Sequence, residues 1–181
     1  MEPVDAIPFP NERPPAPGRL RLVQRFVNTV DYEHGREALH SPARLRALLV
    51  ELGLLAPNAR VTADDLRAAH ELREALRALA LANNGAKTDV VVEAPDLVAT
   101  VEAGGAALES QAGGVEGAFA TLVGIVYTAV ADGTWPRLKA CRRDVCGWLF
   151  YDRSRNRSAR WCQMAVCGNR TKTRAYRARR A

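Results

Sequence analysis

All four cysteines of the 181-residue chain lie between positions 141 and 167. Cys141 and Cys146 form one pair and Cys162 and Cys167 a second, with four residues inside each pair and fifteen between the pairs. Zinc binds four thiolates as a tetrahedron, and two short-range pairs on facing turns can supply that geometry. No His, Asp or Glu stands where it would replace a cysteine and leave an open coordination position. The spacing therefore predicts one structural Zn²⁺ held by these four residues.

Two other interpretations of the cysteines stay open at this point. They could be unrelated buried or free thiols, or redox pairs, because Arg142, Arg143 and Arg160 would lower the pKa of neighbouring thiols. Neither pair has the two-residue spacing of disulfide oxidoreductases, and the segment has few aliphatic residues for a core. The same three arginines could instead neutralise the charge of a tetrathiolate zinc centre. We therefore favour zinc.

The net charge of +6 is distributed unevenly along the chain. Residues 137–181 hold 14 lysines and arginines against two acids, a net charge of +12. The first 136 residues hold the other 12 bases and 18 acids, a net charge of −6. A basic segment attached to an acidic body indicates a polyanionic partner, of which nucleic acid is the first candidate.

Two parts of this basic segment have a spacing suited to phosphate contact. After the last cysteine, the sequence is compatible with a helix capped by Asn169, on which arginines three and four residues apart share one face. Before it, arginines alternate with serine and asparagine in a loop. Tyr176 is the candidate for stacking on a base, although it could simply rest on its neighbours. The candidate nucleic-acid-binding residues are Arg153, Arg155, Arg157, Arg170, Lys172, Arg174, Tyr176, Arg177 and Arg179.

The rest of the chain must position this segment, and its pattern is helical. Apolar residues three and four apart predict helices over about 20–30, 41–52, 62–83 and 115–132. Ser41 before Pro42 is a helix start, and Thr62 with Asp65 resembles a capping box. Residues 90–110 fit a hairpin or a short helix, and we favour the hairpin. The Pro-rich residues 1–18 are expected to form a flexible extension.

Polar residues interrupt the first apolar helix in the sequence FVNTVD. Asn28, Thr29 and Asp31 could line a small-molecule pocket, because helix-interior Asn and Thr are poor choices unless their side chains are used. The alternative is helix capping or a buried backbone contact. The three histidines are scattered, and nothing assembles a nucleophile, a base and an orienting group, so we expect no enzyme and no catalytic residue.

Composition and the N-terminal sequence bear on the location of the protein. With 48% hydrophobic and 25% charged residues, the chain has the make-up of a globular protein and not of a rod or a disordered chain. The first residues are acidic and Pro-rich, unlike a signal peptide, and no run of about 18 apolar residues occurs. We expect a cytoplasmic protein without a membrane partner.

The segment from Cys141 to CGNR at 167–170, with GWLFYDRSRNRSARWC between, resembles the CGNR-type zinc finger of bacterial proteins. FVNTVD at 26–31 resembles the early signature of the helical ABATE domain that precedes this finger in the family. The resemblance implies a mainly α fold: an all-α domain over 19–136 with room for one small β-hairpin, and a zinc-ribbon-like module over 137–181 that ends in the basic helix.

Members of that family are described as regulators of transcription in stress responses or as RNA-binding proteins. The sequence therefore predicts a zinc-containing regulator of transcription that binds DNA or, in second place, RNA through its basic module. The alternative is a protein-docking zinc module on an effector-sensing helical domain that does not touch nucleic acid. A small-molecule effector and a homodimer are partners that the sequence leaves open.

Overall fold

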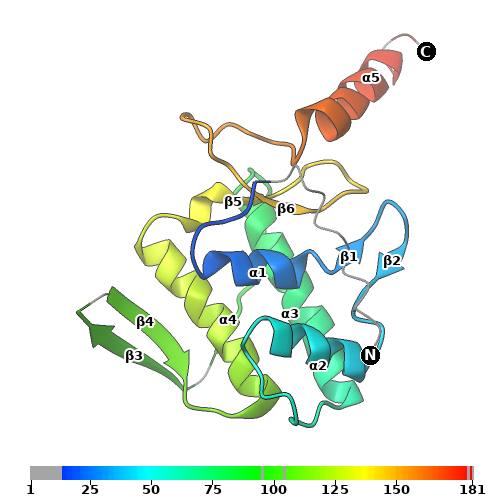
Figure 1. The fold of residues 1–181 in the computed structure, drawn as a ribbon. Coiled ribbons are helices and arrows are strands. Elements are labelled where there is room, and N and C mark those ends of the chain that lie inside the picture. The colour runs from blue at the N-terminus through cyan, green and yellow to red at the C-terminus, as the bar shows by residue number, and fades with distance from the viewer. Residues whose placement is uncertain (1–13, 95, 104, 179, 181) are drawn as a thin grey trace.

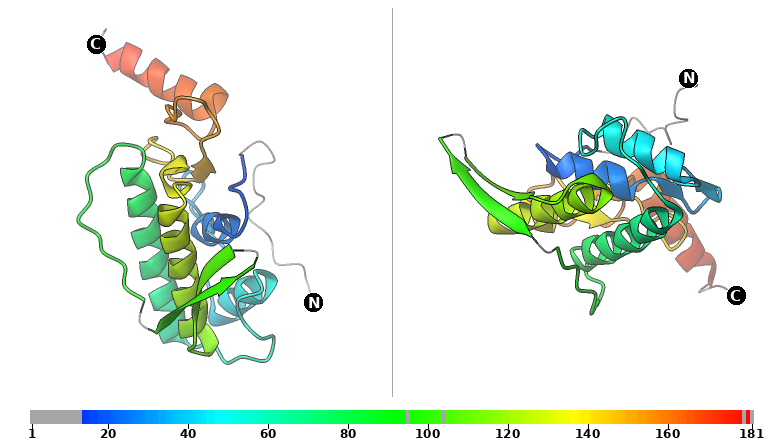
Figure 2. Two further views of the ribbon diagram at one scale, coloured as in Figure 1. Left: turned by 90° about the vertical axis from the view of Figure 1, so that its left-hand side faces the viewer. Right: turned by 90° about the horizontal axis from the view of Figure 1, so that it is seen from below.

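Two long helices that run side by side in the same direction and a shorter helix that crosses them form the centre of the protein (Figure 1, Figure 2). This computed structural model describes residues 14–94, 96–103, 105–178 and 180. The chain is mainly α-helical, as the periodicity predicts. Its helices are α1 (Leu20–Val27), α2 (Pro42–Glu51), α3 (Ala63–Ala82), α4 (Gly114–Ala131) and α5 (Asn169–Ala178), with the short helical turns η1 (Trp135–Arg137) and η2 (Met164–Gly168).

The helix starts that the sequence indicates are present. The Ser41 hydroxyl accepts a hydrogen bond from the Arg44 backbone N–H at 3.3 Å and caps α2. At the start of α3, Thr62 Oγ1 accepts from the Asp65 N–H at 3.1 Å while Asp65 Oδ2 accepts from the Thr62 N–H at 2.7 Å. This reciprocal capping box satisfies two backbone donors that the helix leaves unpaired.

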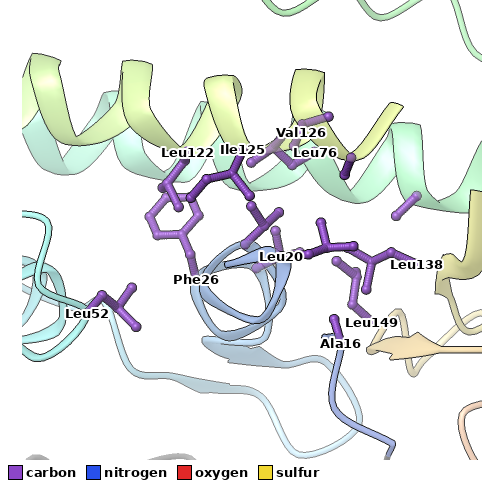
Figure 3. Packing of buried hydrophobic residues seen from close by; sticks show 14 of the residues in the cluster. Ala16, Leu20, Phe26, Leu52, Leu76, Leu122, Ile125, Val126, Leu138 and Leu149 are labelled. Carbon is purple, nitrogen blue, oxygen red and sulfur yellow. The ribbon is translucent and has the colours of Figure 1, made fainter. Parts of the chain in front are cut away.

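Apolar faces of α1, α3 and α4 meet in the main core (Figure 3). Phe26 of α1 is fully buried and lies beside Leu122 of α4, while Leu76 contributes from α3. The Phe26 and Phe119 rings approach at an interplanar angle of 52°, with centroids 6.1 Å apart. Burying each large apolar side chain contributes about 1.5–3 kcal/mol, so this cluster is the main source of stability in the body of the protein.

Within the described residues, three two-stranded antiparallel sheets complete the fold. They pair β1 (Val30–Asp31) with β2 (Arg36–Glu37), β3 (Leu97–Glu102) with β4 (Gly105–Ser110), and β5 (Leu138–Ala140) with β6 (Leu149–Tyr151). The hairpin favoured for residues 90–110 is present as β3–β4, which packs on α4. The N-terminal part is not all-α, because β1–β2 also precedes α2, where the Asp31 side chain and Gly35 shape a tight turn.

The helix α4 is long and apolar enough to cross a membrane by length and composition. Half of it is buried inside the protein, where it packs on α1, α3 and the β3–β4 hairpin. Core helices of soluble proteins pass the same test. Its apolar character therefore has an explanation in the packing of the core.

The start of the described chain and the β5–β6 hairpin are packed onto this core. The Ala16 N–H donates to Gln24 Oε1 at 2.7 Å, and the Tyr151 N–H donates to the Pro14 carbonyl at 3.2 Å. Residues 14–18, which the sequence places in the flexible extension, thus contact α1 and β6; residues 1–13 lie outside the described part. Leu138 of β5 and Leu149 of β6 are fully buried in the main core, so the cysteine-rich segment begins within it.

Candidate metal centre and basic surface

The four cysteine sulfurs meet in one buried cluster just before α5. All four Sγ atoms lie within 4.8 Å of one another, and each cysteine is at most 5% exposed. Cys162 Sγ lies 3.6 Å from Cys146 Sγ and 3.7 Å from Cys167 Sγ. Sulfurs about 2.3 Å from a tetrahedral zinc are about 3.8 Å apart, whereas a disulfide needs about 2.05 Å. The cluster is suited to binding one zinc ion, as the spacing predicts.

Each cysteine pair sits on a turn wide enough for its spacing. The Cys146 N–H donates to the Arg143 carbonyl at 2.8 Å in the first turn. In the second, η2 is a π-helical turn in which the Gly168 N–H donates back to the Gln163 carbonyl at 3.2 Å. This wider turn places Cys167 opposite Cys162 and continues directly into α5. Asn169 has helical backbone angles in that continuous helix, so the expectation that it caps α5 is wrong.

A small second core surrounds the cysteines. Trp148 and Phe150 are buried with them, and Trp161 packs against the group. The Cys141 N–H donates to the Trp148 carbonyl at 2.9 Å, which fixes the end of β5 against the start of β6. The aromatic residues of the basic segment therefore mainly support the zinc turns, with Tyr151 reaching the main core.

The electrostatics of the cluster favour a divalent cation. Hydrogen bonds from Cys146 and Cys162 lower the pKa of Cys141 to about 7. Hydrogen bonds from the other three thiols, assisted by the guanidinium of Arg143, also lower the pKa of Cys167. Cys146 and Cys162 have raised pKa values because they share protons with those two sulfurs. A zinc ion would replace the shared protons, and binding would release them.

The FVNTVD segment attaches the helical body to the finger. Asn28 Nδ2 donates to the Leu149 carbonyl at 2.9 Å, and Asn28 Oδ1 accepts from the Leu149 N–H at 2.7 Å. At the end of α3, Asn84 Nδ2 donates to the carbonyls of Ala140 and Arg160 at 2.8 and 3.0 Å. Arg77 donates to the carbonyls of Val27 and Gly147. Side chains of the body thus bind the backbone of the finger.

Thr29 and Asp31 are also engaged within the fold. Thr29 Oγ1 donates to the Phe26 carbonyl at 2.9 Å and accepts from Arg73, while Asp31 accepts from His34 and Arg36. All three candidate pocket residues are at most 5% exposed. None of them lines the hollows found on the described surface, which lie beside α4 and α5. Their arrangement corresponds to the alternative interpretation, buried backbone contacts and turn formation.

The basic side chains among the candidate nucleic-acid-binding residues lie in two places on the finger. Arg153, Arg155 and Arg157 are exposed in the loop after β6, where Arg153 Nη2 donates to the Pro15 carbonyl at 3.1 Å. The others project from α5, which extends away from the body (Figure 1). Tyr176 is 49% exposed, with the guanidinium carbon of Arg180 4.7 Å from its ring centroid. The exposed candidates on α5 are Arg170, Lys172, Arg174, Tyr176 and Arg177, and Arg179 lies outside the described residues.

A basic hollow of about 420 Å³ separates α5 from the turn between Cys141 and Cys146. Four arginines line it, together with Asp144 and Thr171; they are Arg142, Arg143, Arg170 and Arg174. The sequence predicts a role for Arg142 and Arg143 at the metal centre, and the Arg143 side chain does contact the Cys167 thiol. These arginines lie opposite α5 because of the π-helical turn η2, and the spacing of the cysteines does not predict that turn.

The acids of the finger are already paired, so its surface charge is largely unbalanced. Asp152 is buried and accepts from Lys139 Nζ at 2.8 Å, from Ser154 and from the Ala159 N–H. Burial raises the pKa of Asp152, but these hydrogen bonds outweigh it and hold the pKa below its usual value. Asp144, the other acid, lies 3.9 Å from Arg174 in a highly exposed ion pair.

Fold and site together define a zinc-finger protein with a helical N-terminal domain. A family model described as "Putative stress-induced transcription regulator" (ABATE) matches residues 20–138, and one described as "CGNR zinc finger" matches residues 137–180. The first match covers more than half of the chain, so the chain belongs to the ABATE family, and it carries a CGNR zinc finger. Neither family is described as enzymatic. None of the curated proteins compared with the chain matches it.

Proposed function

We propose that this protein regulates transcription by binding nucleic acid through the basic surface of its zinc finger, with duplex DNA as the first target and RNA as the second. The observation that carries the proposal is the uncompensated charge of the finger. Its 14 bases face two acids, of which Asp152 is buried against Lys139. Phosphate contacts from exposed arginines and lysines supply most of the affinity of non-specific nucleic-acid binding.

Zinc has a structural part in this proposal. Four cysteine ligands leave no coordination position for substrate or water, so the metal would hold the turns that carry Arg142, Arg143 and α5. The helix α5 depends on this arrangement, because it follows Cys167 without a break. The metal would thereby present the basic helix at a fixed angle to the body.

The proposal is tested by fluorescence anisotropy of the zinc-loaded protein with labelled duplex DNA, single-stranded DNA and RNA at several salt concentrations. Replacing Arg170, Arg174 and Arg177 by glutamine should weaken binding to all sequences. It should also flatten the salt dependence, because the slope on duplex DNA changes by roughly 0.9 for each phosphate that the protein no longer neutralises.

A matched control is available on the helical body. Arg21, Arg46 and Arg60 are exposed there, and their replacement by glutamine changes the net charge by the same amount. This control should leave the salt slope unchanged. Equal effects of the two triple variants would reject α5 as the contact surface. Absence of binding to every nucleic acid at low salt would reject the proposal and favour a protein-docking role for the finger.

A further inference from the structure

The β1–β2 turn of the body inserts a carboxylate against the arginines of the finger. Glu33 Oε2 and Oε1 accept from Arg143 Nη1 and Nη2 at 2.7 and 2.8 Å, which is the two-pronged arrangement of arginine with a carboxylate or phosphate. Glu33 Oε1 also accepts from Arg170 Nη1. Hydrogen bonding to Arg143 and the nearby charges hold the pKa of Glu33 below its usual value. One anionic group thus bridges the two sides of the basic hollow.

The turn that carries Glu33 is held firmly in place. On one side of Glu33, the Tyr32 hydroxyl donates a hydrogen bond to Glu74 at 2.5 Å, and the Arg77 guanidinium lies 5.1 Å from the Tyr32 ring centroid. On the other, the buried Asp31 carboxylate accepts from the backbone N–H of His34 at 3.2 Å. These contacts do not involve the finger's arginines. The body therefore presents Glu33 to the hollow from a turn with its own supports.

Glu33 leaves part of the hollow positively charged. The Arg170 side chain is 58% exposed although it contacts Glu33, and Arg174 is 84% exposed. Within the described residues, Arg142 has no ion pair with a carboxylate. Four arginines thus face two carboxylates, Glu33 and Asp144. An entering phosphate would bind the exposed guanidinium groups and would meet the Glu33 carboxylate as a competitor for Arg143 and Arg170.

We propose that the basic hollow is a binding site for a phosphodiester group and that Glu33 is an internal counter-ion for Arg143 and Arg170, two of the arginines that line it, which lowers the affinity of the finger for nucleic acid. The nucleic-acid part rests on the function proposed above; the anion site itself does not. The contact also links the two parts of the protein, because a phosphate that displaces Glu33 breaks the ion pairs between the β1–β2 turn and the finger. Any change that moves this turn would then change affinity at the hollow.

The experiment compares Glu33→Gln with a matched control in the zinc-loaded full chain. Glu109→Gln is the control, because it removes the same charge and breaks the exposed ion pair with Arg19, which is not one of the arginines that line the hollow. Affinity is measured for a labelled DNA duplex and, at constant ionic strength, for inorganic phosphate. Glu33→Gln should tighten duplex binding about three- to tenfold, whereas Glu109→Gln should change it less than about twofold, since a distant surface charge is screened.

A double-mutant cycle separates competition from a general charge effect. In an Arg143→Gln, Arg170→Gln background, Glu33→Gln should bring no gain, because the groups for which the anions compete are absent. Glu33→Asp, which keeps the charge, should remain within about twofold of the original protein and shows whether the turn tolerates substitution. Zinc content and circular dichroism confirm that each variant is folded.

The outcomes distinguish this inference from the function on which it partly rests. Equal gains from Glu33→Gln and Glu109→Gln, or a full gain in the background without the two arginines, would overturn the role of Glu33. If no variant binds the duplex but Glu33→Gln binds inorganic phosphate more tightly than the original protein, the anion site stands and the nucleic-acid function fails. If Glu33→Gln raises affinity for neither ligand, the site is rejected.

Discussion

Asn28 forms a two-way hydrogen bond with the backbone of Leu149, 121 positions away in the chain: its side-chain amide donates to the carbonyl and accepts from the N–H. The backbone of a further strand paired with β6 would form the same two hydrogen bonds, one to the N–H and one to the carbonyl of Leu149. The end of α1 therefore takes the place of a neighbouring strand for the finger. This explains a polar residue at a buried position, 3% exposed, directly after an apolar helix.

Replacing Asn28 by alanine should destabilise the whole protein and not only its finger. The Leu149 N–H would lose its partner in a buried place, at about 1–3 kcal/mol for an unsatisfied group, while the Leu149 carbonyl would keep its hydrogen bond from Gln24 Nε2 at 3.1 Å. We expect the free energy of unfolding, measured by urea denaturation, to fall by about 1–3 kcal/mol. The exposed Asn58 is the matched control, and Asn58→Ala should change stability by less than about 0.5 kcal/mol. Similar values for the two variants would contradict the anchoring role.

Local signals in the sequence predicted much of the fold and the metal centre. Ser41 and the Thr62–Asp65 pair start helices where expected, because capping acts within four residues of sequence. The four cysteines could be recognised because thiolate ligands have few other uses in such a spacing. Neither kind of signal depends on the rest of the chain.

Contacts between distant residues could not be predicted in this way. Glu33 meets Arg143 across 110 positions, and a single acid in a turn has no spacing that indicates its partner. Asn28 stands out in the sequence as an unusual helix residue. Its partner, however, is the backbone of Leu149, and because every residue has a backbone, the sequence does not indicate which one is bound. A hydrogen bond from a side chain to the backbone constrains the residue type of only one of its two partners. A polar residue in a ligand pocket and one that anchors the backbone therefore look alike in the sequence.

Removal of zinc should disorder the cysteine turns and α5 while the β5–β6 hairpin stays attached to the main core. Structural zinc sites contribute apparent binding free energies on the order of 10–16 kcal/mol, and the small core around the cysteines has little else to hold it. In a Trp135→Phe variant, the remaining Trp148 and Trp161 report only on that core. A chelator should shift their emission to the red and release about one zinc per chain.

The control for zinc removal is a variant that keeps only Trp135, which belongs to the main core. Its emission should hardly respond to the chelator, because α3 and α4 keep their packing. A red shift in both variants would mean that the body needs the metal as well. No shift in either variant, with zinc released, would contradict a structural role of the ion.

Protonation of Asp152 should lower the stability of the protein at acid pH. Its folded pKa lies below its usual value, and an unfolded Asp has a pKa of about 3.9. The charged form therefore contributes full stability above about pH 4, and this contribution is lost as the pH falls through the lower folded pKa. Urea midpoints measured from pH 7 to 3 should fall at the acid end of that range, at constant ionic strength.

Replacing Asp152 by asparagine should lower stability at neutral pH and reduce the acid slope. Lys139 is 5% exposed and would lose its buried partner, a change that costs about 3–5 kcal/mol. Asp64→Asn, at an exposed ion pair with Arg67, should keep both the neutral stability and the acid slope of the original protein. An acid slope in Asp152→Asn as steep as in the original protein would assign the acid sensitivity to other groups, such as the zinc-binding thiolates.

Gly124 should be required for the contact between α4 and the β3–β4 hairpin. A Cβ at this position would lie 2.5 Å from the Leu108 carbonyl oxygen and 3.2 Å from Leu108 Cβ. The first distance is well below the van der Waals contact distance, so the backbone of β4 would have to shift. Alanine would raise helix propensity by about 1 kcal/mol, but overpacking typically costs about 1–3 kcal/mol. We therefore expect Gly124→Ala to lower the free energy of unfolding modestly and to speed hydrogen exchange of the β4 amides.

Gly113→Ala separates the steric effect from the general effect of a glycine substitution. Gly113 precedes α4 with an ordinary negative φ of −87°, and a Cβ there meets no atom within 4 Å. This variant should cost less than about 1 kcal/mol, because alanine is a poorer N-cap than glycine, and it should leave exchange in β4 unchanged. If Gly124→Ala proved as stable as the original protein with slow exchange in β4, helix propensity would outweigh the contact, and the hairpin would be held by its own strand pairing.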